Sequence, residues 1–487
     1  MHCLRESTVA ILILSCLTGA QARADEVSAP DTPAGKLFAA WLDAVNSGDR
    51  ATIKQFVAER MAPPPSGALP VDQITNRNLG RFKESDGFAL RRISASEPHK
   101  IAAFVQAKRT GYGYEISMAV TEQPPHKILG TGQRGVEAPP DLLPKERLSE
   151  QAIHERIDAL VTKLSEADAF SGAILVAKDG KPFYERAAGF ASRAWDVPNR
   201  VDTKFNVASI GKMFTAVAVA QLVEQGKLSY DDTVGKVMPD YANKDVAERV
   251  TVGHLLSHTS GLPSGGSASN GLFDKRYRAV KDYLPSFVND SPAFEPGSKF
   301  LYSNCGYYLL GAIIEKASGQ TYHDYVRAHV FQPAGMTNTD NYDLDTDPPS
   351  LATGYMDAPG GQRRSNVFRL PIRGVPVGLG YSTVGDMLKF DAALRDHTLL
   401  SEQSLKTIWT GRIETDRGGQ YGYGCHLRQY NGARIVWHGG GWVGITNQFE
   451  IYPDLGYTVV ILCNIDNNPT AIAMKLREWL AQGTNER

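Results

Sequence analysis

Strand-forming segments at both ends of one long region constrain the fold of this chain most. Residues 172–177 form an uninterrupted apolar run, and the Asp179-Gly180 turn leads into a second strand through Phe183 and Tyr184. Asp-Gly between apolar runs is a strong hairpin signal. Similar strand-like segments return near the C-terminus, at residues 420–430, 435–438, 446–452 and 457–463.

One antiparallel sheet is predicted to hold both groups of strands, because helices and loops occupy the chain between them. A helix over residues 471–481 would cover this sheet. Residues 151–487 are therefore predicted to form a single α/β domain, in which an antiparallel sheet is flanked by helices.

The region before it, residues 33–136, has a different pattern. Apolar residues share one helical face over residues 34–46. Apolar and polar residues then alternate over 101–107 and again over 116–120, which predicts a hairpin. Helices followed by antiparallel strands predict a small α+β domain. This order of helices and strands resembles that of the cone-shaped ketosteroid-isomerase-like domains. Since no catalytic pair is found in it, we expect an accessory module, joined to the second domain by a proline-containing linker at 137–150.

The first 24 residues predict a cleavable signal peptide of the bacterial type. An apolar run at residues 9–14 precedes Ala22-Arg23-Ala24, a small-x-small cleavage site. This run is too short to span a bilayer. We expect a periplasmic or secreted protein without a transmembrane segment. An apolar N-terminal helix and lipid attachment at Cys16 are the alternatives.

The charge balance and the cysteines exclude several classes of protein. Lys plus Arg is 52 against 53 for Asp plus Glu, so the net charge of -1 offers no general attraction for nucleic acid. Cleavage of the signal peptide would leave Cys305, Cys425 and Cys463. Three widely spaced cysteines match neither a disulfide framework nor a zinc site, and the sequence does not determine their state. No cofactor is expected, and the oligomeric state is left open.

Ser209-Ile210-Gly211-Lys212 is the first segment that suggests chemistry. A helix is predicted to begin at the serine, and residues three apart lie on one helical face. Lys212 would therefore lie one turn above the Ser209 hydroxyl. Serine is a poor nucleophile unless a neighbouring base activates it, and an amine is one such base. An S-x-x-K motif alone is weak evidence, because a capped helix start with a solvated lysine has the same pattern.

Two later motifs strengthen this interpretation. Tyr302-Ser303-Asn304 precedes a helical stretch at 307–317, and His438 ends a predicted strand just before three glycines, Gly439, Gly440 and Gly441. Glycines let the backbone approach a substrate closely and offer an N–H to a developing oxyanion. A second Y-x-N at Tyr241-Ala242-Asn243 lies in a polar connector and is interpreted as structural.

With these motifs in this order, the chain resembles the serine β-lactamase and penicillin-binding-protein superfamily. The similarity covers about residues 165–485 and is greatest to class C β-lactamase-like esterases and D-amino-acid peptidases. It includes the segments 205–227, 251–262, 302–311 and 378–383.

The resemblance implies a role for each motif residue. Ser209 would be the acylated nucleophile, Lys212 and Tyr302 would share the general-base role, and Asn304 would orient Lys212 and the substrate. The backbone N–H groups of Ser209 and Gly441 would form the oxyanion hole, with Gly439 and Gly440 beside it.

Two expectations concern charge. The ordinary pKa of tyrosine is about 10, and we expect the Lys212 cation to lower the pKa of Tyr302. His438 stands where true β-lactamases carry a lysine that can hold the substrate carboxylate. With an ordinary pKa near 6.5, this histidine would be mostly neutral at neutral pH, and weak β-lactamase activity would rise as the pH falls.

The sequence therefore predicts an exported serine hydrolase that acts on short acyl esters or D-amino-acid peptides. A β-lactamase or peptidoglycan DD-carboxypeptidase is the first alternative, and a non-catalytic sensor with the same fold is the second. His254 and His258 lack the glutamate of H-E-x-x-H, so a zinc site is not expected. No G-x-S-x-G motif is found, which disfavours the α/β-hydrolase fold.

Overall fold

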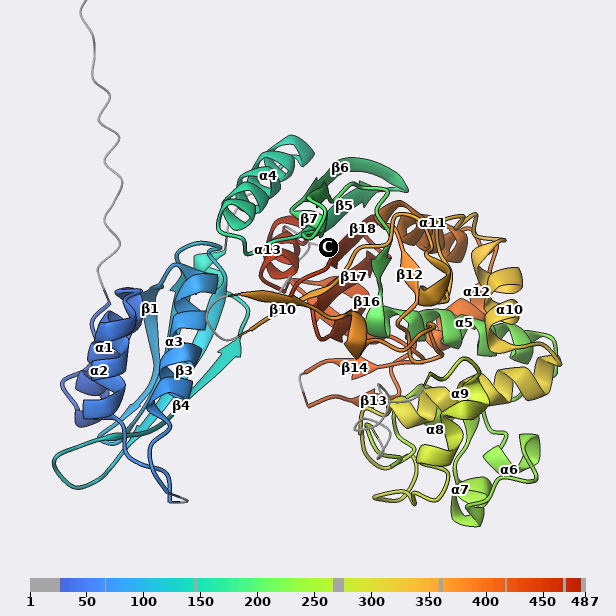
Figure 1. The fold of residues 1–487 in the computed structure, drawn as a ribbon, viewed down its shortest axis with the longest axis horizontal. Helices are drawn as coiled ribbons and strands as arrows, with labels where there is room; N and C mark the ends of the chain where they lie inside the picture. Colours follow the sequence, from blue (N-terminus) through green and yellow to red (C-terminus); the bar gives the residue numbers. More distant parts are fainter. Residues whose placement is uncertain are drawn as a thin grey trace, which may run out of the picture.

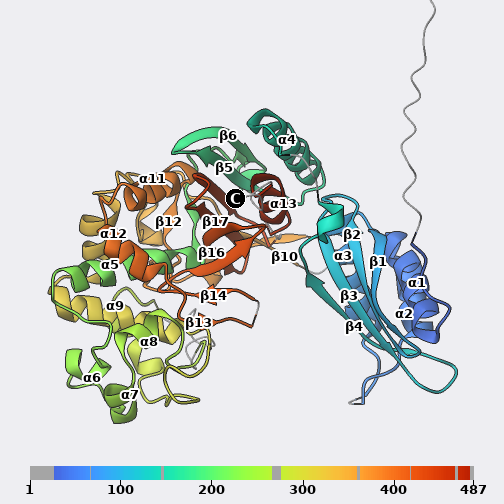
Figure 2. The ribbon, with the colours of Figure 1, turned by 180° about the vertical axis from the view of Figure 1, so that it is seen from behind.

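The computed structural model describes residues 27–65, 67–143, 147–265, 276–358, 362–416, 418–466 and 470–482. The predicted signal peptide at residues 1–24 lies outside the described residues. Two parts are visible in Figures 1 and 2: a small one built from the N-terminal helices and strands, and a large one that contains the C-terminal strands.

The small part consists of helices followed by a four-stranded antiparallel sheet. Its helices are α1 (Pro33–Asn46), α2 (Arg50–Arg60) and α3 (Val71–Ser85). Its strands, in both chain and sheet order, are β1 (Phe88–Glu97), β2 (Lys100–Ala107), β3 (Gly113–Val120) and β4 (Ile128–Gly135). Phe38 and Trp41 of α1 belong to one buried cluster with Val105 and Ile116 of the sheet. The predicted hairpin is confirmed as β2 and β3, whereas the likeness to ketosteroid-isomerase-like domains stays a prediction.

An eight-stranded antiparallel sheet lies at the centre of the large part, in the order β13-β14-β15-β16-β17-β18-β5-β6. The strands are β13 (Ile413–Glu414), β14 (Gln420–Tyr421), β15 (His426–Tyr430), β16 (Ala433–Trp442), β17 (Ile445–Tyr452), β18 (Tyr457–Cys463), β5 (Gly172–Lys178) and β6 (Lys181–Ala188). The last strand, β18, pairs with β5, and Val459 lies opposite Val176. The prediction that both ends of the region share one sheet is confirmed.

Helices cover both faces of this sheet, which explains the uninterrupted apolar run of β5. The covering helices are α5 (Gly211–Glu224), α11 (Val384–Arg395), α4 (Glu150–Glu166) and α13 (Thr470–Leu480). Ala173 and Leu175 belong to the core that α5 and α11 share, whereas Ile174 and Val176 belong to the core formed with α4 and α13. Successive residues of a strand point to opposite faces, so a strand that is buried on both sides must be apolar throughout.

Shorter elements complete the large part. The helices are α6 (Val234–Val237), α7 (Lys244–Arg249), α8 (Val252–Leu256), α9 (Asn304–Ser318), α10 (Tyr322–Val326) and α12 (Glu402–Ile408). The strand pairs are β7 (Phe190–Ser192) with β8 (Val197–Pro198), β9 (Phe205–Asn206) with β12 (Tyr381–Ser382), and β10 (Tyr355–Asp357) with β11 (Arg363–Ser365). Among the described helices, none combines the length and the apolar character that a membrane span requires.

The small part contacts the large one beside the C-terminal helix. Tyr112 packs with Ala471 and Met474 of α13, and Glu137 forms an ion pair of 3.3 Å with Arg428 of β15. These contacts lie on the α13 side of the sheet, whereas the serine of the S-x-x-K motif lies on the α5 side.

Two details of the sheet differ from the sequence prediction. The predicted strand at 420–430 is two strands, β14 and β15, joined by a turn in which Gly424 has a φ of 77°. The glycines after His438 do not follow the strand but belong to it, because β17 pairs with all of them and Gly441 lies opposite Thr446. Pairing along β16 thus overrides the weak strand preference of glycine.

Candidate active site

Ser209 lies in a 3-10 turn, η2 (Ala208–Ile210), that leads directly into α5. The sequence predicted that a helix begins at the serine, whereas α5 begins at Gly211. The residue before the serine, Ala208, has a φ of 45°, in the left-handed region. A non-glycine residue in that region costs about 1–2 kcal/mol. The turn is fixed by close packing: a Cβ at Gly378 would lie 1.8 Å from the Ala208 carbonyl oxygen. Only glycine fits at residue 378, whose φ is also positive, at 126°.

Lys212 is fully buried and contacts three oxygen atoms. Its Nζ lies 2.9 Å from Asn304 Oδ1, 2.9 Å from the Val377 carbonyl oxygen and 3.3 Å from Ser209 Oγ. None of these partners carries a negative charge, so burial lowers the pKa of Lys212 well below its ordinary value. A neutral amine has two N–H groups and one lone pair. Asn304 Oδ1 and the Val377 oxygen can only accept, which leaves the lone pair for the Ser209 hydroxyl.

Tyr302 is the third member of this group. Its hydroxyl is hydrogen-bonded to Ser209, and Lys212 Nζ lies 4.8 Å from the centre of its ring. Burial raises the pKa of Tyr302, and the hydrogen bond with Ser209 offsets only part of this increase. The expectation that Lys212 lowers the pKa of Tyr302 is therefore wrong. Loss of water disfavours the charge on both groups, so a neutral phenol beside a neutral amine is favoured.

Asn304 reaches Lys212 because it is the first residue of α9. Ser303 caps this helix, since its side chain accepts a hydrogen bond from Gly306 N. Helices α5 and α9 pack together in the same core, which places the S-x-x-K and Y-x-N motifs face to face. The structure thus brings Ser209, Lys212, Tyr302 and Asn304 together.

The glycine segment of β16 runs beside the turn that carries Ser209. The ladder with β15 ends where Trp437 pairs with His426, and the next part of the strand approaches η2 instead. A Cβ at Gly440 would lie 2.3 Å from the Val207 carbonyl oxygen, whereas a Cβ at Gly441 would have no atom within 4 Å. Gly440 thus allows the close approach, and the space beside Gly441 is open.

His438 is 2% exposed and is occupied by contacts within the protein. Its Nδ1 lies 2.6 Å from the Gly439 carbonyl oxygen and its Nε2 lies 3.1 Å from the Tyr421 hydroxyl. Nδ1 therefore donates and Nε2 accepts. Burial, with His426 and Lys212 nearby, lowers the pKa of His438 well below 6.5. The expected titration of this residue near pH 6.5 is therefore wrong, because a buried imidazole cannot easily take a charge.

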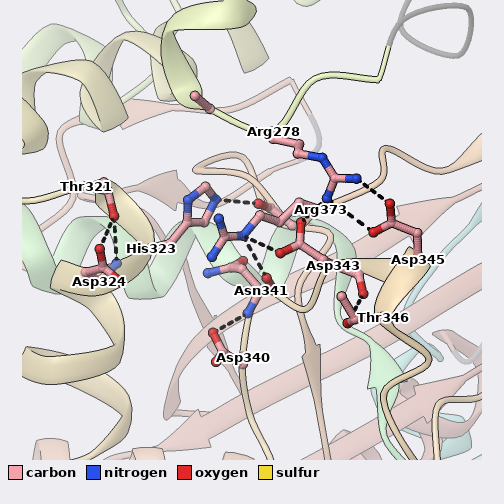
Figure 3. A network of polar contacts seen from close by, with 12 residues as sticks. Arg278, Thr321, His323, Asp324, Asp340, Asn341, Asp343, Asp345, Thr346 and Arg373 are labelled. Atoms are coloured by element: carbon pink, nitrogen blue, oxygen red, sulfur yellow. Dashed lines mark hydrogen bonds and ion pairs between the residues drawn. The ribbon is translucent and has the colours of Figure 1, made fainter.

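The loop that presents the Val377 carbonyl is held in place by a polar network (Figure 3). His323 Nε2 donates to the Gly374 carbonyl oxygen over 2.9 Å, and Arg373 Nε donates to the Asn341 carbonyl oxygen over 3.2 Å. Burial lowers the pKa of His323 to about 4, so this ring stays a neutral donor. Val377 could not be identified from the sequence, because a backbone carbonyl group has no residue-type signal, although the neighbouring Gly378 marks the close approach of the chain.

The other candidate residues have structural roles. His254 belongs to the N-terminal cap of α8 together with Thr251, and Asn243 caps α7, which confirms the structural interpretation of the second Y-x-N. Cys305, Cys425 and Cys463 are all buried. Burial raises the pKa of Cys425 to about 12, which makes its thiol unreactive. Within the described ranges, no group of His, Cys, Asp and Glu is arranged to hold a metal ion.

Comparisons with known proteins agree with this fold. A family model described as beta-lactamase matches residues 157–483. Penicillin-binding protein 4* of Bacillus subtilis is 32% identical over 328 residues, which cover 64% of this chain and 71% of that protein.

Two solved structures extend the comparison. A penicillin binding protein from Bacillus halodurans is 34% identical with a TM-score of 0.59, and the match covers 68% of this chain and 99% of that one. D-amino acid amidase from Ochrobactrum anthropi is 25% identical with a TM-score of 0.57, covering 65% of this chain and 95% of that one.

The large part therefore has the fold of the β-lactamases and penicillin-binding proteins, and the chain belongs to the β-lactamase family. It is a serine hydrolase of that family.

Proposed function

We propose that this chain is an exported serine hydrolase that cleaves short acyl esters or D-amino-acid amides and peptides through an acyl-enzyme on Ser209. The observation that carries the proposal is the environment of Lys212, whose Nζ faces two acceptor oxygens and the Ser209 hydroxyl in a buried position. Such an amine is a base that is ready at neutral pH.

In the first step, Ser209 Oγ attacks the substrate carbonyl carbon while its proton moves to Lys212 Nζ. Lys212 then carries three N–H groups, and Asn304 Oδ1 and the Val377 carbonyl oxygen stabilise the new charge. The negative charge on the substrate oxygen is held by the backbone N–H groups of Ser209 and Gly441.

The leaving group takes its proton from the Tyr302 hydroxyl, and Lys212 replaces the proton on Tyr302. Water then attacks the acyl-enzyme, and the same two groups remove its proton and return one to Ser209 Oγ. At the end of the cycle Ser209, Lys212 and Tyr302 have regained their starting protonation states.

We expect the rate of acylation to fall as Lys212 becomes protonated, at a pH well below the ordinary range of lysine. The depressed pKa of Lys212 sets this acid limb, and the raised pKa of Tyr302 removes any alkaline fall near neutral pH. The measurement is the second-order rate of labelling by a fluorophosphonate from pH 5 to 10, with the Tyr302→Phe variant expected to keep the acid limb in place. Labelling that begins only near pH 10, the ordinary range of lysine, would contradict a neutral Lys212.

The substrate preference follows from His438. A neutral, buried imidazole that is bonded to Tyr421 and Gly439 offers no cation to a β-lactam carboxylate. The loss of a charge-assisted bond lowers transition-state binding by about ten- to a hundredfold. We expect kcat/KM for a p-nitrophenyl acyl ester or a D-alanine anilide to exceed that for a chromogenic cephalosporin by at least this factor.

Because the pKa of His438 lies well below 6.5, the ratio between ester and cephalosporin is expected to stay constant from pH 5.5 to 8. A cephalosporin preferred at pH 7.5 would favour the β-lactamase or DD-carboxypeptidase alternative, to which the names of the penicillin-binding relatives also point. A protein that binds these compounds without turnover or covalent labelling would be the non-catalytic sensor.

A further inference from the structure

His258 contacts the chain on both sides of Tyr302. It follows α8 and has a φ of 57°, in the left-handed region. Its carbonyl oxygen accepts a hydrogen bond from Leu301 N over 2.8 Å. Its side-chain Nδ1 accepts a second one from Ser303 N over 3.0 Å. One residue therefore binds the residue before Tyr302 and the residue after it.

These bonds determine the protonation of the imidazole. A backbone N–H can only donate, so Nδ1 of His258 must carry the lone pair and Nε2 the proton. The ring is fully buried, and its Nε2 makes no hydrogen bond within the described residues. Rings of Tyr302, Tyr307 and Tyr421 lie around it, with centroids 4.2, 5.0 and 4.8 Å away. The imidazole thus also packs against the ring of Tyr302 itself.

We infer that His258 is a positioning residue, which orients Tyr302 toward Ser209 by binding both of its neighbours and by packing against its ring. The inference rests on the proposed function, since it concerns the same site. His258 also fixes the start of α9, because Ser303 is the cap of that helix and Asn304 is its first residue. The positions of Tyr302 and Asn304, which both contact the Ser209–Lys212 pair, therefore depend on the imidazole of His258.

A neutral ring is required for this role. A proton on Nδ1 would place two N–H groups against each other and break the bond to Ser303. Burial, with Lys212 and His438 nearby, lowers the pKa of His258 well below 6.5, so the lone pair is kept at neutral pH.

Three variants at this position separate the Nδ1 contact from general packing. His258→Ala removes the acceptor. His258→Asn places its Oδ1 where Nδ1 lies and tolerates the left-handed backbone. His258→Gln places its oxygen one bond further out, near the position of Nε2. All three lose the ring, so the Asn and Gln variants are matched controls for each other.

We expect His258→Ala to lower kcat about a hundredfold while KM changes less than threefold, since a small displacement of a reacting group has an effect of this order. His258→Asn should recover kcat to within about tenfold of the original enzyme, whereas His258→Gln should not. An unchanged kcat in His258→Ala, or equal recovery by Asn and Gln, would overturn the inference.

Nitrogen NMR of the unsubstituted protein, with ¹⁵N-labelled histidine, gives a test that does not depend on the folding of a variant. We expect His258 to show an unprotonated Nδ1 and a protonated Nε2 from pH 6 to 8. A protonated Nδ1 in this range would overturn the inference. Absence of fluorophosphonate labelling in the unsubstituted protein would instead contradict the proposed function, so the two failures are distinguishable.

Discussion

Ser209→Ala is expected to abolish covalent labelling by a fluorophosphonate and to lower turnover at least about a thousandfold, within the range seen when nucleophiles are removed. Ser209 Oγ is the atom that lies 3.3 Å from Lys212 Nζ and that shares a hydrogen bond with Tyr302. The measurement is the intact mass after labelling, together with kcat/KM for a p-nitrophenyl ester.

Ser401→Ala is a suitable control for this experiment, because Ser401 is an exposed cap residue of α12. This variant should be labelled to the same extent as the unsubstituted protein. If Ser209→Ala is still labelled at full stoichiometry, another residue is the nucleophile. If neither the variant nor the original is labelled, the non-catalytic alternative gains support.

The sheet could be predicted from the sequence because burial on both faces leaves a simple pattern. Residues 172–177 are apolar at every position, and the same holds for most of 457–463. The strand β16 was predicted to end too early, since the glycines at 439–441 carry no apolar signal of their own. Their place in the strand is set by pairing with β17 and by the turn beneath Gly440, which are long-range contacts.

The motif residues of the site could likewise be found from the sequence, but their protonation could not. The sequence predicted a Lys212 cation beside Tyr302 and an ordinary pKa for His438. Both expectations were wrong because burial shifts these pKa values, and no residue type encodes burial. In the structure Lys212 is without exposed surface and His438 is 2% exposed, and desolvation outweighs the mutual effect of the groups.

Other parts of the site could not be predicted from the sequence for a similar reason. Val377 contributes a carbonyl oxygen, and Tyr421 contributes a hydroxyl to His438. Neither belongs to a local motif, and both are brought to the site by the fold. His258 was considered only as a metal ligand, because its contact to Ser303 joins residues that are far apart in the sequence.

The expected effects of removing Lys212 and Tyr302 follow from their different contacts. Lys212→Ala should lower kcat by at least about a thousandfold, because Ser209 then has no base. Tyr302→Phe should cost less but still about a hundredfold, since it removes one proton carrier and leaves the amine in place. Tyr307→Phe is the control: the Tyr307 ring also lies near Lys212 Nζ, at 5.2 Å, yet its hydroxyl donates to the Leu256 carbonyl oxygen, so kcat should change little.

The double variant that combines Lys212→Ala with Tyr302→Phe tests whether the two groups act as one unit. Groups that move the same proton cannot each contribute their full effect, so the double variant should be little slower than Lys212→Ala alone. The measurement is kcat for a p-nitrophenyl ester in all four proteins of the cycle, at a pH on the plateau of the pH profile. Losses that simply multiply would show independent action, in which case Tyr302 serves substrate binding and Lys212 alone moves the proton.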